Sequence, residues 1–173
     1  PLPETEVKII GENDEDLTLK GIPGELCVRG PQVMSGYYNR PDETEKVMTK
    51  DGFFRTGDVG VMDTRGYFKI IDRKKDMILV SGFNVYPSEI EEVIAKHPKV
   101  LEVAAIGVPD EKSGEVPKLF IVKKDPSLTT EEIIAYAKQN LTGYKCPRYV
   151  EFMDDLPKSN VGKILRKDLR KPA

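Results

Sequence analysis

Residues 72–91 read DRKKDMILVSGFNVYPSEIE, and the pattern of the chain changes within them. Upstream of this stretch, short alternating segments separated by turn residues predict strands. Downstream of it, apolar residues at helical spacing alternate with apolar runs of strand length. We therefore expect an α+β fold in two parts: a β-rich part at residues 1–72 and a small α+β domain at residues 73–173.

Turn residues organise the first part. Asp63-Thr64-Arg65-Gly66 predicts a hairpin turn between strands at 59–62 and 67–71. Further strands are expected at 7–10 and 24–30. One short helix is expected at 41–48, because its acidic residues lie near its start, where the helix dipole favours them.

The second part carries two sequence signatures of helix N-termini. Ser88 with Glu91, and Thr129 with Glu132, each have the spacing of a capping box. The first helix should stop before Pro98, with His97 as a cap that interacts with the helix dipole. Strands are expected at 103–108, 118–124 and 148–153.

Composition excludes several classes of function. The 27 basic and 29 acidic residues nearly cancel, so no overall field favours nucleic acid. Cys27 and Cys146 lie far apart without a CxxC spacing, which favours a reduced, cytosolic protein over a disulfide scaffold or a zinc site. The apolar run at 77–80 is far shorter than the about 20 residues that cross a bilayer.

A polar loop near the C-terminus presents one lysine. Residues 157–166 read PKSNVGKILR, and a lysine behind a glycine on such a loop can swing into a site and out again. The alternative is a solvated basic loop. The neighbouring basic residues are expected to be solvated surface charges without a catalytic role: Lys158, Arg166, Lys167 and Arg170.

Three other positions suit ligand contacts. The carboxylate of Asp58 can accept two hydrogen bonds, which matches the paired hydroxyls of a ribose, although a turn aspartate would serve its own backbone. Arg73 offers a fork of donors for ribose or phosphate oxygens; the alternative is a surface charge. Gly82 would let an extended ligand pass close to the backbone, and a strand-end glycine is the competing interpretation.

The order and spacing of three segments carry a family resemblance. GFFRTGD at 52–58, the stretch at 72–91 and the loop at 157–166 resemble the C-terminal third of the adenylate-forming enzymes. Together with LTGYKCP from Leu141, the sequences of these segments are most similar to those of bacterial long-chain fatty acyl-CoA synthetases. The resemblance implies that residues 1–72 are the β-rich end of the large adenylating domain and that residues 73–173 are a mobile lid domain.

The resemblance also implies roles for individual residues. Lys163 would stabilise the charge that develops as a fatty acid carboxylate attacks ATP, and Asp72 would be the hinge of the lid. Ligand contacts are implied for Asp58 and Arg73 at the ribose, for Asn84 at the adenylate, and for Ser81, Gly82 and Phe83 at the pantetheine arm of CoA.

We expect the chain to be an inactive piece of a longer polypeptide. It begins without methionine, and the family's phosphate-cradling loop does not occur in it. Fatty acid, ATP and CoA are the expected ligands, and Mg²⁺ should be held mainly by the absent large domain. The resemblance further implies a cytoplasmic enzyme that contacts the inner face of the membrane peripherally and dimerises through the absent region. Two alternatives remain: an adenylation domain that loads a carrier protein, and a non-catalytic nucleotide-binding module.

Overall fold

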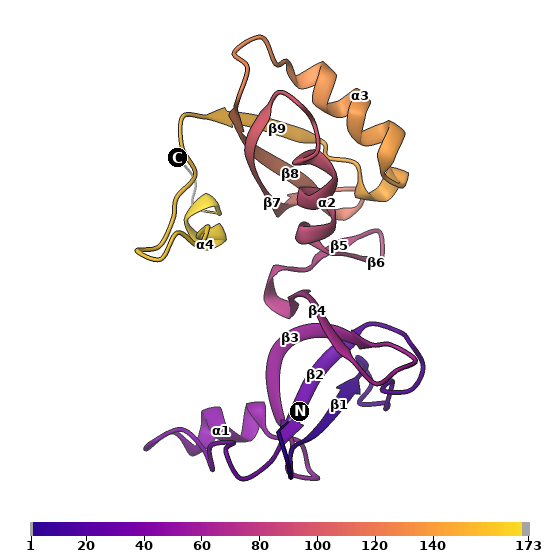
Figure 1. Ribbon diagram of the computed structural model, residues 1–173, viewed down its shortest axis with the longest axis vertical. Coiled ribbons are helices and arrows are strands. Elements are labelled where there is room, and N and C mark those ends of the chain that lie inside the picture. The colour runs from indigo at the N-terminus through magenta and orange to yellow at the C-terminus, as the bar shows by residue number, and fades with distance from the viewer. Residues whose placement is uncertain (1, 171–173) are drawn as a thin grey trace. The chain divides into compact units, whose positions relative to one another are not determined.

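The chain forms two compact units. The computed structural model describes residues 2–170, and contacts divide it into Pro1–Lys75 and Asp76–Ala173. Figure 1 labels the helices and strands of both units. The combination of sheets and helices confirms the predicted α+β class. The division falls three residues after Asp72, so the hinge at this residue stays a prediction.

The first unit is built on a four-stranded antiparallel sheet. The strands lie in chain order: β1 (Glu6–Ile10), β2 (Gly24–Arg29), β3 (Phe54–Met62) and β4 (Phe68–Arg73). Helix α1 (Pro41–Val47) lies between β2 and β3 in the chain, as expected from its acidic first turn. The predicted hairpin turn is present, because Asp63 Oδ1 accepts hydrogen bonds from the backbone of Arg65 and Tyr67.

In the described part of the chain, the second unit packs three α-helices and a 3₁₀ turn against a five-stranded sheet, and a further 3₁₀ turn, η1 (Lys74–Asp76), leads into it. The strands are β5 (Ile78–Val80), β6 (Phe83–Val85), β7 (Val100–Asp110), β8 (Gly114–Lys123) and β9 (Tyr149–Met153). The helices are α2 (Pro87–Ile94), α3 (Thr130–Asn140), α4 (Arg166–Leu169) and the 3₁₀ turn η2 (Gly143–Lys145). Strand β8 is central: β7 pairs with it antiparallel and β9 parallel. Strand β5 pairs antiparallel with β8 near the start of β8.

Alternation along β8 creates a core on each face of this sheet. Leu119 and Ile121 point to one face and pack with residues of α2 and α3. Phe120 and Val122 point to the other face and pack with Leu169 of α4 and with residues of the C-terminal segment. The C-terminal segment is therefore part of the fold of this unit.

One predicted capping box is confirmed and the other is wrong. Thr129 and Glu132 make both reciprocal hydrogen bonds at the start of α3. Helix α2 begins at Pro87 with Tyr86 as its N-cap, because the fixed φ of proline suits the first helical position and places Ser88 inside the helix. The side chain of Glu91 reaches the backbone N–H of Ala105 instead, at 2.8 Å.

His97 makes contacts that the sequence did not indicate. It lies beyond the end of α2, its ring packs edge-on against Tyr136 at 4.9 Å, and its Nδ1 accepts a hydrogen bond from the backbone of Lys99. The ring contact joins the segment after α2 to α3, and the expected interaction with the helix dipole stays a prediction. No helix among residues 2–170 has both the length and the apolar character needed to cross a membrane.

We predict that Ile121→Ala lowers the free energy of unfolding of the second unit by about 2–5 kcal/mol, because it leaves a cavity at a fully buried position. Val161→Ala is the control, since Val161 is 88% exposed. Urea denaturation of the chain measures both changes. Equal effects of the two substitutions would contradict the described core.

Candidate functional site

Asp58 and Arg73, both predicted at a ribose, lie together. They are directly opposite each other on β3 and β4, and Arg73 Nε lies 2.8 Å from Asp58 Oδ1. The side chains are 24% and 48% exposed. Because exposed ion pairs contribute little to stability, these groups can exchange their mutual contact for contacts with a ligand at small cost.

A buried carboxylate supports the irregular part of β3 before Asp58, where the pairing with β2 shifts register. Glu25 is 7% exposed and accepts hydrogen bonds from Arg55, from Lys74 and from the backbone N–H of Gly57. Gly57 has a φ of +71°, which suits glycine. Sequence analysis missed Glu25, because its partners lie 30 to 49 residues away in the chain.

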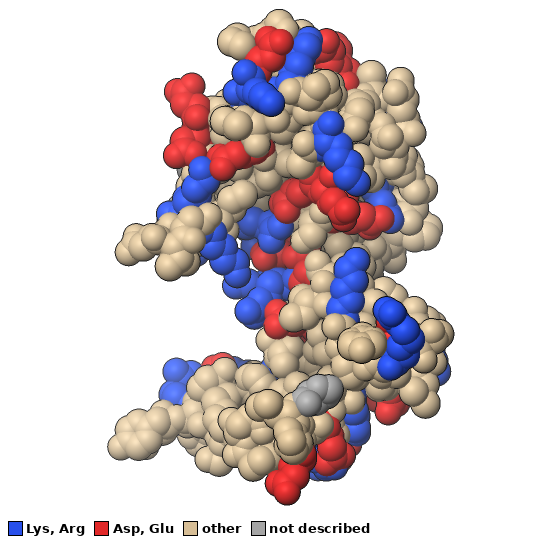
Figure 2. Space-filling view, in the orientation of Figure 1, with Lys and Arg blue, Asp and Glu red and all other residues tan. Residues whose placement is uncertain are grey.

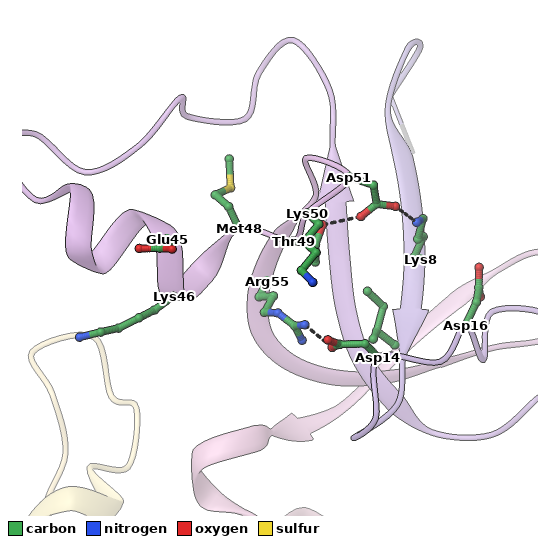
Figure 3. Close-up of a pocket in the computed structure, with 11 residues that line it drawn as sticks. Lys8, Asp14, Asp16, Glu45, Lys46, Met48, Thr49, Lys50, Asp51 and Arg55 are labelled. Atoms are coloured by element: carbon green, nitrogen blue, oxygen red, sulfur yellow. Dashed lines mark hydrogen bonds and ion pairs between the residues drawn. The ribbon is translucent and has the colours of Figure 1, made fainter.

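Two grooves of the first unit differ in character. An apolar groove of about 520 Å³ has Asp58 on its wall, together with side chains of all four strands and the β3–β4 turn. A larger groove of about 760 Å³ is lined mainly by charged side chains (Figure 3). Two ion pairs cross this charged groove, Lys8 with Asp51 and Arg55 with Asp14. None of the predicted site residues lines the charged groove.

The predicted CoA and adenylate residues share one hairpin of the second unit. Ser81 and Gly82 form its two-residue turn with φ values of +50° and +85°, as a type I′ turn requires. Phe83 stacks on Tyr144 with ring centroids 4.6 Å apart, and Asn84 lies opposite Leu79. An added Cβ at Gly82 would meet no atom within 4 Å, so the space beside this turn is open.

Lys163 lies on a second hairpin, formed by residues 157–165. Backbone hydrogen bonds join Ser159 with Lys163 and Pro157 with Leu165, and Gly162 turns the chain with a φ of +78°. These hydrogen bonds make the segment a defined turn, and the expected movement of the lysine into and out of a site stays a prediction. Lys163 is exposed, and its ammonium has no partner within residues 2–170.

The neighbouring basic residues were predicted as solvated surface charges: Lys158, Lys167 and Arg170 are exposed, whereas Arg166 is largely buried, with its side chain 20% exposed. Lys158 pairs with Glu102 and Asp155, whose hydrogen bonds raise the pKa of Lys158. Arg166 and Arg170 also pair with carboxylates of the second unit. Lys167 is exposed, as expected.

The two hairpins lie on opposite sides of the second unit (Figure 1). The segment between β9 and α4 carries Lys163 on one side, and β5 and β6 carry the Ser81–Gly82 turn on the other.

Neither a metal site nor a reactive thiol emerges from the described residues. No group of three His, Cys, Asp or Glu side chains within 2–170 has the arrangement of a metal site. Cys27 and Cys146 are free thiols, and burial raises the pKa of Cys27 to about 11. On the face drawn in Figure 2, basic and acidic side chains are interspersed.

Comparison with protein families identifies the class. Residues 1–38 match the model of the AMP-binding enzymes, and residues 89–163 match the model of the AMP-binding enzyme C-terminal domain. The chain belongs to this family, which confirms the resemblance seen in its motifs.

Among individual relatives, long-chain-fatty-acid–CoA ligases match the whole chain. Identity is 60% over 173 residues to the ligase of Escherichia coli O157:H7 and 61% over 170 residues to that of Yersinia pestis. The chain spans about 30% of the length of these relatives.

Solved structures of related enzymes share the fold. ATP-bound MatB from Rhodopseudomonas palustris matches 98% of the chain with a TM-score of 0.91 and 37% identity. The o-succinylbenzoate CoA synthetase of Bacillus subtilis, in complex with its acyl-adenylate intermediate, matches 100% of the chain with a TM-score of 0.87 and 35% identity. The chain covers 34% and 35% of these two structures.

Proposed function

We propose that the chain acts as the C-terminal part of an AMP-forming, long-chain fatty acyl-CoA ligase of the cytoplasm. The observation that carries the proposal is the 60% identity to such a ligase across all 173 residues. The geometry of the two hairpins agrees with it, because a two-step reaction needs two sets of residues. In the proposed reaction, Mg²⁺ accompanies ATP and is held mainly by the large domain.

In the first half-reaction, an oxygen of the fatty acid carboxylate attacks the α-phosphorus of ATP. The bond from this phosphorus to the bridging oxygen breaks, and pyrophosphate leaves with its electron pair. Two anions must approach each other in this step, and further charge develops on the leaving group. The ammonium of Lys163 has no carboxylate partner among the described residues, so it is available to orient both anions and to offset their charge.

In the second half-reaction, the sulfur of CoA attacks the carbonyl carbon of the acyl-adenylate, and AMP leaves. The Ser81–Gly82 turn is proposed to flank the pantetheine arm, since the space beside Gly82 is open. A rotation about a hinge near Asp72 would exchange the two hairpins. Asn84, beside this turn, is proposed to reach the adenylate.

Asp58 and Arg73 are proposed to hold the ribose of the nucleotide. We predict that Asp58→Asn weakens ATP binding by about 10- to 100-fold, because a hydrogen bond to a charged group contributes about 1.5–3 kcal/mol. The KM for ATP in adenylation measures this change. Asp63→Asn is the control, since Asp63 serves the β3–β4 turn. An unchanged KM in Asp58→Asn would remove this residue from the ribose site.

A chimera tests the proposed function. This chain replaces the aligned residues of the E. coli ligase, to which it is 60% identical over its full length. We expect the folded chimera to release pyrophosphate and to form acyl-CoA from a long-chain fatty acid, ATP and CoA. A folded chimera without pyrophosphate exchange that depends on fatty acid would contradict the proposal.

A further inference from the structure

A network of charged side chains lies at the base of the Lys163 hairpin, and its exposure ranges from 9% at Asp76 to 35% at Arg170. Arg166 begins α4, three residues after Lys163, and its guanidinium binds Glu91 in a two-pronged manner: Nη2 to Oε2 at 2.7 Å and Nε to Oε1 at 3.2 Å. Both side chains are mostly buried, at 20% and 18% exposure. Because Glu91 also accepts a hydrogen bond from Ala105, the network joins α4 to α2 and β7.

The same network reaches the start of the second unit. Asp76 is the first residue of this unit, and its side chain is only 9% exposed. Its Oδ1 accepts a hydrogen bond from Arg170 at 2.8 Å, and its Oδ2 lies 3.6 Å from Nη1 of Arg166. Arg166 therefore lies between Asp76, shortly after the proposed hinge, and Glu91 of α2.

Apolar contacts and a second ion pair complete this attachment. Ile164 and Leu169, on either side of Arg166, pack against the core face formed by Phe120 and Val122. On the other strand of the hairpin, Lys158 pairs with Glu102 of β7 at 2.8 Å. Both strands of the hairpin are thus held to the sheet, whereas the side chain of Lys163 at its tip is exposed.

We propose that Arg166 is a positioning residue for adenylation, which fixes the Lys163 hairpin to Asp76 and Glu91 so that the start of the second unit, its sheet and the lysine move as one body. This inference rests on the proposed role of Lys163. A guanidinium suits the task because its planar fork can bind two carboxylates at once, which a single ammonium cannot do with the same geometry. Without the guanidinium of Arg166, the side chain of Lys163 is still present, but its ammonium is poorly positioned at the reaction centre.

The proposal predicts a selective defect. In the chimera, Arg166→Gln should lower the rate of adenylation by about 10- to 100-fold, since small misplacement of a catalytic group has effects of this size. Thioester formation from supplied acyl-adenylate should change by less than about threefold, because the Ser81–Gly82 turn lies on the other side of the unit. Lys167→Gln removes a neighbouring charge from an exposed position and should leave both rates unchanged.

A double mutant separates positioning from a general loss of structure. If Arg166 acts through Lys163, then Arg166→Gln should cause no further loss of adenylation in a Lys163→Ala background. Hydrogen exchange at 159–163 should also become faster in Arg166→Gln and stay unchanged in Lys167→Gln. Should Arg166→Gln fail to fold, Arg166→Lys replaces it, with a smaller loss expected in the same half-reaction.

The results that would overturn this inference differ from those that would overturn the proposed function. If the unsubstituted chimera does not adenylate fatty acid, the proposed function is wrong. If it does, and Lys163→Ala impairs it, then the inference is overturned by any of three results: wild-type adenylation in the Arg166 variant, equal losses in both half-reactions, or losses that simply multiply in the double mutant.

Discussion

Replacing Lys163 by Ala should lower the rate of adenylation in the chimera by about 100-fold or more, the loss expected when one charge-stabilising group is removed from a preorganised site. The ammonium is exposed at the tip of a fixed hairpin, so its removal disturbs no packing. Thioester formation from supplied acyl-adenylate should be much less affected. Pyrophosphate exchange and a CoA-dependent thioester assay measure the two steps separately.

The control for this substitution is Lys167→Ala. Lys158, on the same hairpin, is unsuitable because its ion pairs with Glu102 and Asp155 hold the hairpin. Lys167 is exposed on α4 and carries the same charge. Wild-type pyrophosphate exchange in Lys163→Ala, or an equal loss in Lys167→Ala, would show that the lysine of the hairpin tip has no special role.

Replacing Gly82 by Leu should have the opposite selectivity. We expect thioester formation to fall by about tenfold or more, because a side chain forced into an occupied path costs about 1–3 kcal/mol. Pyrophosphate exchange should remain close to that of the unsubstituted chimera. Gly82 has a positive φ, so Leu also strains the turn. Asn adopts a positive φ more readily than Leu does, so Gly82→Asn adds a side chain with less backbone strain and isolates the effect of the added volume.

Gly21 provides the matched control for Gly82. It also has a positive φ and open space where a Cβ would be, but it lies in a loop of the first unit. Gly21→Leu should therefore cause similar local strain without a change in either half-reaction. If Gly82→Leu reduced both half-reactions equally, or if Gly82→Asn left thioester formation intact, the turn would have only a structural role.

Local signals in the sequence predicted much of the fold. The turn at Asp63–Gly66 and the capping box at Thr129 involve residues within a few positions of each other, and both are present. The capping box predicted at Ser88 does not form. Pro87 occupies the first helical position, and the side chain of Glu91 binds the backbone of Ala105 instead. Propensity alone does not decide such a competition.

The contacts that organise the candidate site were not predictable in this way. Arg166 and Glu91 are 75 residues apart in the chain, and Arg170 and Asp76 are 94 apart. In the sequence, Arg166 is one of a run of basic residues, which is typical of a solvated face. Only the fold shows that Arg166 is largely buried and paired with carboxylates, whereas Lys167 is exposed. The pairing of Asp58 with Arg73 likewise depends on the register of β3 and β4.

Opposite sides of the second unit are proposed to serve different half-reactions. The decisive measurement is the ratio of thioester formation to pyrophosphate exchange, determined in one chimera for Lys163→Ala and Gly82→Leu. We expect this ratio to rise by about tenfold or more in Lys163→Ala, which loses adenylation. We expect it to fall by a similar factor in Gly82→Leu, which loses thioester formation. Shifts of the ratio in the same direction in both variants, or no shift in either, would show that the two sides do not serve different half-reactions.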